Sequence, residues 1–110
     1  MFDRLRRTWA YHRIPADLRV FHALVNGETY TLDICRKYRV GVGKIYALLM
    51  VAENWGHISS EWEPNGTPHP RRRYYLTPEQ RTRIERVSTD PLHRDHWTRL
   101  DRLRAEEGRP

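Results

Sequence analysis

Three adjacent arginines, Arg71, Arg72 and Arg73, are the side chains of this sequence with the clearest capacity for ligand chemistry. Each guanidinium carries a rigid fork of N–H donors, which matches phosphate oxygens and the acceptor edge of guanine. The residues that follow, 74–77, favour a β-strand, so Arg71 and Arg73 should point to one side and Arg72 to the other. Such arginines reach phosphates or a narrow minor groove. We expect at least one of them to contact DNA; the alternative is a solvated run of charge.

A second candidate group lies where a predicted helix begins, at Gly43, Lys44 and Tyr46. The apolar residues that follow at helical spacing form the buried face of this helix, and Lys44 and Tyr46 lie off that face. The N-terminal end of a recognition helix meets base edges, and glycine lets the backbone approach a phosphate. The alternatives are a solvated lysine, a partly buried tyrosine and a glycine that only forms a turn.

The charge of the whole chain favours an acidic partner. Lysine and arginine together number 20 against 14 acidic residues, which gives a net charge of +6 and a pI near 10.0. Nucleic acid is the first candidate for such a partner, and an anionic membrane surface is the second. A GC-rich coding sequence would explain the preference for arginine over lysine, but not the excess of positive charge. Arg36, Lys37 and Arg39 end a predicted helix and are candidate contacts to backbone phosphates.

Other kinds of chemistry find no support in the residue pattern. His93 and His96 are three positions apart on a predicted helix, but no second cysteine or matched acidic cluster completes four zinc ligands. No nucleophile–base pair, phosphate-binding loop or spaced pair of carboxylates is recognisable, so we expect no enzymatic activity, metal or cofactor. Cys35 is the single cysteine, which excludes an intrachain disulfide. Without a long apolar run or a signal peptide, we expect a cytoplasmic protein with no membrane association.

The elements that would position these groups follow from periodicity and capping signals. Residues 1–14 form either a basic N-terminal arm or a short helix. The pattern predicts helices at 15–25, 31–38 and 43–54, strands at 57–63 and 71–77, a helix from 77 to 87, and a last helical segment ending at Gly108. Asn65-Gly66 favours a tight turn between the strands. Thr77 and Gln80 are a capping-box pair around Pro78, which marks a helix start.

Apolar residues at helical or alternating spacing identify the expected core. The positions expected to be buried are Leu18, Phe21, Leu24, Val25, Leu32, Ile34, Cys35, Val42, Ile45, Leu48, Leu49, Ala52, Trp62, Tyr74, Leu76, Ile84 and Val87. The last helical segment carries a stripe of Leu92, His96, Leu100 and Leu103, with Trp97 beside it. An amphipathic end helix on so small a domain favours a dimer interface at Trp97, Leu100 and Leu103, with packing inside the monomer as the alternative.

The order of the predicted elements is that of a winged helix-turn-helix. We therefore expect a mainly α fold with a small β-hairpin, extended by helices at both ends. The 110 residues suffice for a single core and thus for one domain. Within it, residues 15–87 would form the winged helix-turn-helix DNA-binding region, and residues 88–110 a C-terminal dimerisation helix and tail.

Two linked stretches also resemble a known family. KIYALLMVAENWGHISSEWE (residues 44–63) and PHPRRRYYLTPEQRTRIE (residues 68–85) resemble the PadR-type transcriptional regulators. The resemblance covers residues 24–87 and implies a homodimeric DNA-binding regulator whose C-terminal helix helps to form the dimer. The family's Pro-Ser-Xaa-Gly-Thr before the recognition helix is Gly41-Val42-Gly43-Lys44-Ile45 here, so Lys44 would supply a charge where the family has hydroxyl groups.

Together these observations predict a sequence-specific DNA-binding transcriptional regulator. We expect it to act as a repressor, as a homodimer on a palindromic operator in double-stranded DNA, with a small-molecule effector that the sequence does not identify. The two recognition helices would enter major grooves ~34 Å apart. Two alternatives remain open: a winged-helix protein-interaction module, and a DNA-architectural accessory factor of a mobile element.

Overall fold

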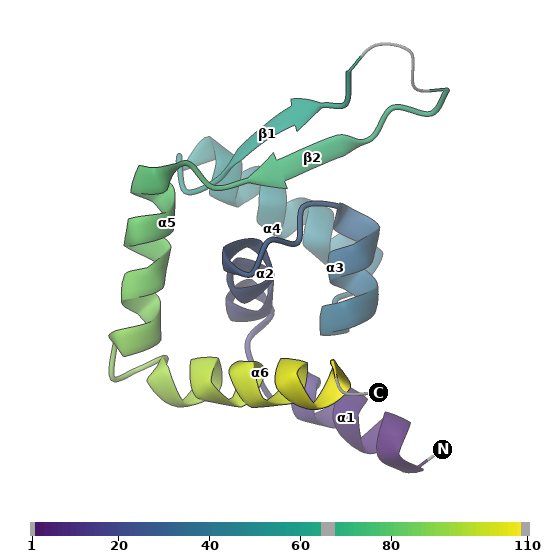
Figure 1. The fold of residues 1–110 in the computed structure, drawn as a ribbon, viewed down its shortest axis with the longest axis vertical. Coiled ribbons are helices and arrows are strands. Elements are labelled where there is room, and N and C mark those ends of the chain that lie inside the picture. The colour runs from purple at the N-terminus through teal and green to yellow at the C-terminus, as the bar shows by residue number, and fades with distance from the viewer. Residues whose placement is uncertain (1, 65–67, 109–110) are drawn as a thin grey trace.

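The described chain, residues 2–64 and 68–108 of a computed structural model, is mainly helical and carries a two-stranded antiparallel hairpin (Figure 1). In chain order the elements are α1 (Phe2–His12), α2 (Ala16–Val25), α3 (Thr31–Tyr38), α4 (Val42–Asn54), β1 (Ser59–Trp62), β2 (Arg72–Tyr75), α5 (Pro78–Glu85), the 3-10 helix η1 (Arg86–Thr89) and α6 (Arg94–Glu107). The prediction of a mainly α fold with a small hairpin is confirmed.

Helices α2, α3 and α4 occupy the middle of the molecule, with the hairpin at one end and α1 and α6 at the other (Figure 1). α2 contacts α3, α5 and α6, while α3 contacts α4 and β2. α5 runs along one side and leads from the hairpin through η1 to α6. The two ends of the described chain therefore lie on the same side of the molecule, far from the hairpin.

Local sequence signals determine where several elements begin and end. The backbone N–H of Gln80 donates to Thr77 Oγ1 at 3.2 Å, and Gln80 Oε1 accepts from the Thr77 N–H at 2.9 Å. This reciprocal pair is the predicted capping box at the start of α5. Gly27 and Gly56 have φ of +87° and +76° and follow α2 and α4, where a left-handed residue ends a helix.

The core lies between the central helices and α6. Ile34, Ile45, Leu49 and Leu100 are fully buried there. The other expected core residues that are buried are Leu18, Leu24, Ala52, Tyr74 and Ile84, and those partly buried against the core are Phe21, Val25, Cys35, Leu48, Leu76, Val87 and Leu103. The predicted stripes therefore identify most of the core.

Three residues expected in the core, Leu32, Val42 and Trp62, are exposed instead, as is Leu92 of the predicted stripe on the last helical segment. Leu32 lies one residue, about 100° of helix rotation, from Thr31, which belongs to the buried face of α3. Val42 is the first residue of α4 and precedes its buried face. Trp62 ends β1 where the hairpin extends away from the body, and Leu92 lies in a turn before α6 begins.

Residues 2–12 form the helix α1, which agrees with the short helix predicted as one alternative for this end of the chain. Tyr11, in the last turn of α1, is fully buried, and its hydroxyl donates to Glu107 Oε2 at 2.9 Å. Leu5 and Trp9, on another side of α1, are exposed. The helix thus packs on the body through one side and leaves apolar side chains uncovered on the other.

The hairpin has a defined register in which Ser59 pairs with Tyr75 and Trp62 with Arg72. The segment before α3 adds to it: the N–H of Tyr74 donates to the Thr29 carbonyl at 2.9 Å, and Tyr30 forms an isolated bridge with Arg73. β2 is therefore tied to the start of α3 as well as to β1. The predicted Asn65-Gly66 turn lies outside the described residues.

Candidate nucleic-acid interface

The exposed edge of α4 carries the residues expected to read DNA. Gly43, Lys44 and Tyr46 are exposed, whereas Ile45 and Leu49 are fully buried and anchor the opposite side of the helix. No ion pair within residues 2–64 and 68–108 involves Lys44. The first turns of α4 therefore present a cation and a phenol to solvent, in the arrangement that the sequence predicted.

Each of the three arginines at the hairpin is held by a glutamate. Arg71 Nη2 lies 3.2 Å from Glu63 Oε1, and Arg72 Nη2 lies 3.3 Å from Glu53 Oε1. Arg73 pairs with Glu61, which stands directly opposite it in the strand register. Their charges are thus partly balanced within the protein.

Each guanidinium also lies over an aromatic ring. Arg71 Cζ is 3.9 Å from the ring centroid of Tyr30, and Arg72 Cζ is 5.7 Å from that of Trp62. Arg73 Cζ is 5.5 Å from the ring centroid of Tyr75. Cation–π contacts of this kind orient the fork without consuming its N–H donors. The arginines are therefore positioned before any ligand arrives.

A groove of about 420 Å³ lies between the hairpin, the start of α3 and α4. We call it the hairpin groove; it is lined by Tyr30, Thr31, Leu32, Asp33, Tyr46, Trp62, Pro70, Arg71, Arg72 and Tyr74. It brings Tyr46 of α4 together with two of the hairpin arginines. The groove does not include Gly43, Lys44 or Arg73. The predicted DNA-binding residues therefore do not form a single cluster: some line the groove and the others lie beside it.

Tyr30 and Glu63 are hydrogen-bonded at the edge of the hairpin groove. The bond from the Tyr30 hydroxyl is the first cause that raises the pKa of this phenol, and the same bond lowers the pKa of Glu63. Burial of the ring raises the pKa of Tyr74 at the floor of the groove. Both phenols therefore remain protonated near neutral pH, and Glu63 remains a carboxylate that competes for Arg71.

Arg39 lies apart from the hairpin groove, so the structure does not bring it together with the other predicted DNA contacts. Its guanidinium lies 2.7 Å from Glu107 Oε1 of α6 and 4.9 Å from the ring centroid of Tyr11. Arg39 itself has φ of 54°, the left-handed conformation that ends α3. The side chain is directed toward α1 and α6 because those two helices cover the C-terminal end of α3.

Two of the three expected dimer residues, Trp97 and Leu100, lie in the core of the single chain rather than on a surface. Leu100 is fully buried and Trp97 is 6% exposed within a single chain, so hardly any of their surface could contact a second copy. Both pack in the chain's own core, as the alternative of packing inside the monomer requires, and Leu103 packs partly against it. Uncovered apolar surface lies instead on α1, where Leu5 and Trp9 are 62% and 66% exposed.

Sequence reasoning missed the glutamate partners and the aromatic supports of the arginines. Glu61 had a usable signal, because a hairpin register that pairs Trp62 with Arg72 places it opposite Arg73. Glu53 had none, since it comes from α4 and meets Arg72 only in the folded chain. Tyr30 is likewise brought to Arg71 by the pairing of residues 29–30 with β2.

Other classes of site are not found in the described part of the chain. Residues 2–64 and 68–108 contain no group of three or more histidine, cysteine, aspartate or glutamate side chains arranged to hold a metal ion. Within the same ranges, no helix has the length and apolar character needed to cross a membrane. No protein-family model, curated protein or solved structure matches this chain.

Proposed function

We propose that this chain is a winged helix-turn-helix transcriptional regulator that binds double-stranded DNA. In this assignment α3 and α4 form the helix-turn-helix, α4 enters the major groove, and the β1–β2 hairpin is the wing. The observation that carries the proposal is the hairpin groove, where Tyr46 of α4 meets Arg71 and Arg72. It offers phenol and guanidinium donors, which are typical contacts to backbone phosphates.

The binding step would be an exchange of partners at the arginines. Arg71 and Arg72 have side chains that are 60% and 43% exposed, and ion pairs at such sites contribute only about 0–1 kcal/mol. A DNA phosphate therefore replaces Glu63 or Glu53 at small cost, while the aromatic rings keep each guanidinium in place. Lys44 would approach the bases or a phosphate from the first turn of α4.

The assembly that we propose is a cytoplasmic homodimer that acts as a repressor on a palindromic operator. Two-fold symmetry would place the two α4 helices about 34 Å apart, one turn of DNA. Because Trp97 and Leu100 are buried within the chain, the apolar side of α1 that carries Leu5 and Trp9 is the better candidate for the dimer contact. An effector that changes the dimer geometry would release the operator.

The first test removes the hairpin arginines from the full chain. The bound sequences are first selected from a random DNA pool, and the affinity of the selected DNA is then measured at several salt concentrations. The Arg71→Ala/Arg72→Ala/Arg73→Ala variant should bind more weakly, and the slope of log affinity against log salt should become shallower by ~0.9 for each phosphate that the variant no longer neutralises. A salt response that is flat in the unmodified chain would contradict DNA binding.

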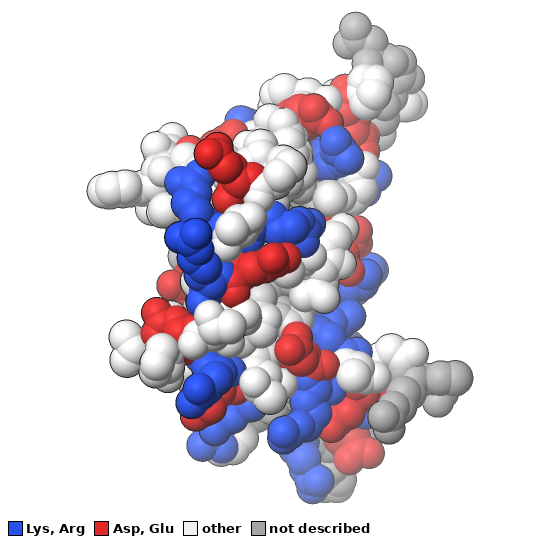
Figure 2. All heavy atoms as spheres, turned by 60° about the vertical axis from the view of Figure 1, so that its left-hand side comes forward, with Lys and Arg blue, Asp and Glu red and all other residues white. Residues whose placement is uncertain are grey.

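A matched control removes the same charge elsewhere. Arg83, Arg86 and Arg94 are exposed and lie on α5, η1 and the start of α6. The side of the molecule that carries α5 has basic and acidic side chains interleaved rather than gathered into one patch (Figure 2). The Arg83→Ala/Arg86→Ala/Arg94→Ala variant should therefore keep its DNA affinity. Equal decreases in affinity in both triple variants would mean that only net charge matters.

One observation favours the alternative of a protein-interaction module. A second groove, of about 550 Å³, lies between α2 and α4 and has mainly apolar walls that include Phe21, Val51 and Trp55. Val51 of α4 and Trp55, directly after its end, are exposed. If a partner protein with a complementary apolar segment docks here, Val51→Ser/Trp55→Ser should abolish its binding and leave DNA affinity unchanged. DNA affinity that falls with the same variant would assign this surface to the DNA interface.

A further inference from the structure

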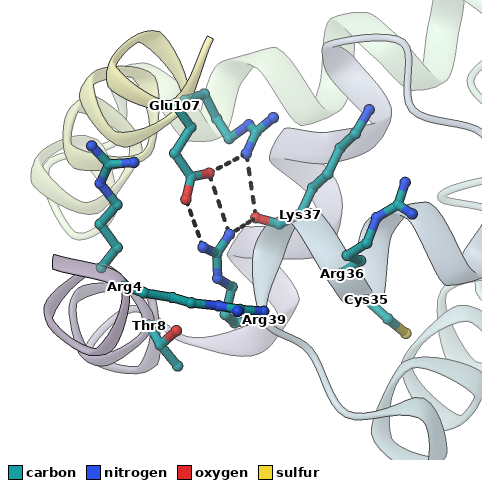
Figure 3. A pocket seen from close by; sticks show the side chains of 9 residues that line it. Arg4, Thr8, Cys35, Arg36, Lys37, Arg39 and Glu107 are labelled. Carbon is teal, nitrogen blue, oxygen red and sulfur yellow. Dashed lines mark hydrogen bonds and ion pairs between the residues drawn. The ribbon is translucent and has the colours of Figure 1, made fainter. Parts of the chain in front are cut away.

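A basic pocket of about 570 Å³ lies at the end of the molecule opposite the hairpin, between α1, the end of α3 and α6 (Figure 3). Six cationic side chains line it: Arg4, Arg7, Arg36, Lys37, Arg39 and Arg104. It shares no residue with the hairpin groove. We refer to this site as the basic pocket.

The acidic residues near the basic pocket balance only part of this charge. Glu107 lies 2.7 Å from Arg39 and 2.5 Å from Arg104, and Figure 3 shows it bridging the two sides of the pocket. Outside this bridge, Arg36 pairs with Asp33 and Lys37 pairs with Glu28. Three carboxylates therefore face six cations.

Arg4 and Arg7 supply the unbalanced charge. Neither side chain forms an ion pair or hydrogen bond with any residue in the ranges 2–64 and 68–108. They are three residues apart on α1, so they lie on the same side of that helix. Burial raises the pKa of the Cys35 thiol in the pocket wall, so this side chain adds no negative charge.

The shape and charge of the basic pocket define a class of ligand. Its volume is within the range of pockets that hold small molecules. Arginine forks recognise oxyanions by paired, charge-assisted hydrogen bonds. Among the described residues Arg4 and Arg7 are unpaired, whereas Arg36 and Lys37 hold Asp33 and Glu28 and extend away from Arg4 (Figure 3). Because six cations face three carboxylates, the pocket favours a ligand with several negative charges over one with a single charge.

We propose that the basic pocket binds a small molecule that carries two or more phosphate groups. Arg4 and Arg7 are the main donors to it, and the remaining positive charge of the pocket attracts its further phosphate groups. The six cations gather around one hollow of about 570 Å³, a size that suits a compact ligand; a DNA backbone shares the phosphate chemistry, and the test separates the two. The site does not depend on the DNA-binding function proposed above.

The test titrates the full chain with inorganic triphosphate by calorimetry at constant ionic strength. Saturable binding of one triphosphate per chain is expected. The Arg4→Ala/Arg7→Ala variant should bind about tenfold more weakly or worse, since it cannot form the charge-assisted hydrogen bonds to phosphate. Arg4→Lys/Arg7→Lys keeps the charge without the fork, so its affinity should lie between the two. The melting temperature of the unmodified chain should rise with triphosphate concentration.

The control variant Arg83→Ala/Arg86→Ala removes the same charge on the α5 side and should bind triphosphate as the unmodified chain does. Circular dichroism checks that each variant keeps its helices, which is expected because Arg4 and Arg7 hold no other described residue. No saturable binding, or equal decreases in affinity in the two double alanine variants, would overturn the proposal. It would also be overturned if triphosphate fails to bind while Arg4→Ala/Arg7→Ala weakens DNA binding, since the pocket would then serve the DNA backbone.

Discussion

His22 is a buried histidine whose protonation state affects the stability of the fold. It is fully buried, with Nε2 2.6 Å from Asp101 Oδ1 and Nδ1 2.8 Å from the Tyr38 hydroxyl oxygen. A carboxylate only accepts, so Nε2 carries the proton and Nδ1 accepts from Tyr38. Its ring centroid is 4.9 Å from that of Trp97. The neutral imidazole therefore satisfies both of its hydrogen bonds while it packs against α6.

The stability of the fold should consequently decrease in mild acid. Burial lowers the pKa of His22 and outweighs the opposite effect of Asp101, while the charge of Arg104 adds to the lowering. In the unfolded chain the imidazole titrates near 6.5, so below that pH the unfolded state takes up the proton first. The free energy of unfolding should fall as the pH drops from 7 to 5, by up to ~1.4 kcal/mol per pH unit. Urea unfolding at several pH values measures this.

Two substitutions separate His22 from the other histidines. His22→Gln should reduce stability at pH 7 and remove most of the slope between pH 7 and 5. His57 is exposed, and His57→Gln should leave both the stability and the slope as they are. A His22→Gln variant with an unchanged slope would assign the acid sensitivity to other groups.

Residue periodicity could identify the apolar side of α2 but not its buried polar members. Arg19 is 5% exposed, and its guanidinium donates to the Ile14, Tyr38 and Arg39 carbonyls. These acceptors lie up to 20 positions away, and Asp101 lies 79 positions from His22. An arginine or histidine is buried only when such partners arrive, and that depends on tertiary packing rather than on the residues nearby.

In the hairpin, too, the sequence predicts the secondary structure but not the tertiary contacts of its side chains. Alternation and turn residues predicted both strands, and the capping box predicted the start of α5. They did not predict that Trp62 would be exposed or that Glu53 of α4 would hold Arg72 of β2. Those features depend on how the hairpin is placed over α4. The hairpin arginines were thus identified from the sequence, whereas their partners were not.

Glu53 offers a test of the exchange between carboxylate and phosphate at the hairpin. In the Glu53→Gln variant, Arg72 loses its ionic partner but keeps its contacts with Ser60 and Trp62. DNA affinity should rise several-fold, because a phosphate no longer competes with the carboxylate for the guanidinium; one exposed pair is worth about 0–1 kcal/mol. Fluorescence anisotropy with the selected DNA measures the change.

The control for this effect is Glu79→Gln, which removes one negative charge from an exposed position on α5. It should raise the affinity less than Glu53→Gln does. Equal increases would indicate a general effect of net charge. A lower affinity in Glu53→Gln would mean that the carboxylate holds Arg72 in its binding position rather than competing for it.

At the scale of the whole molecule, α6 is part of the monomer. The Tyr11 hydroxyl donates a hydrogen bond to Glu107, 96 positions away in the sequence, and the same carboxylate forms ion pairs with Arg104 and Arg39. Trp97 and Leu100 also pack in the core. Together these contacts hold α6 against α1, α2 and α3. An amphipathic stripe predicts that a helix is covered on one side, but it does not say whether the same chain or a second copy covers it.

The dimer contact can therefore be tested on α1 instead of α6. Leu5→Ser/Trp9→Ser alters exposed side chains, so the variant should stay folded, sediment as a monomer and bind the palindromic operator more weakly than the unmodified chain. Leu92→Ser, which changes an exposed leucine before α6, is the control and should remain dimeric. Leu100→Asp should instead lower stability strongly, because it places a carboxylate in the core.

Sedimentation velocity over a range of concentrations measures the oligomeric state of each variant. An α1 variant that remains dimeric would exclude this contact, and an unmodified chain that is monomeric at every concentration would exclude the dimer.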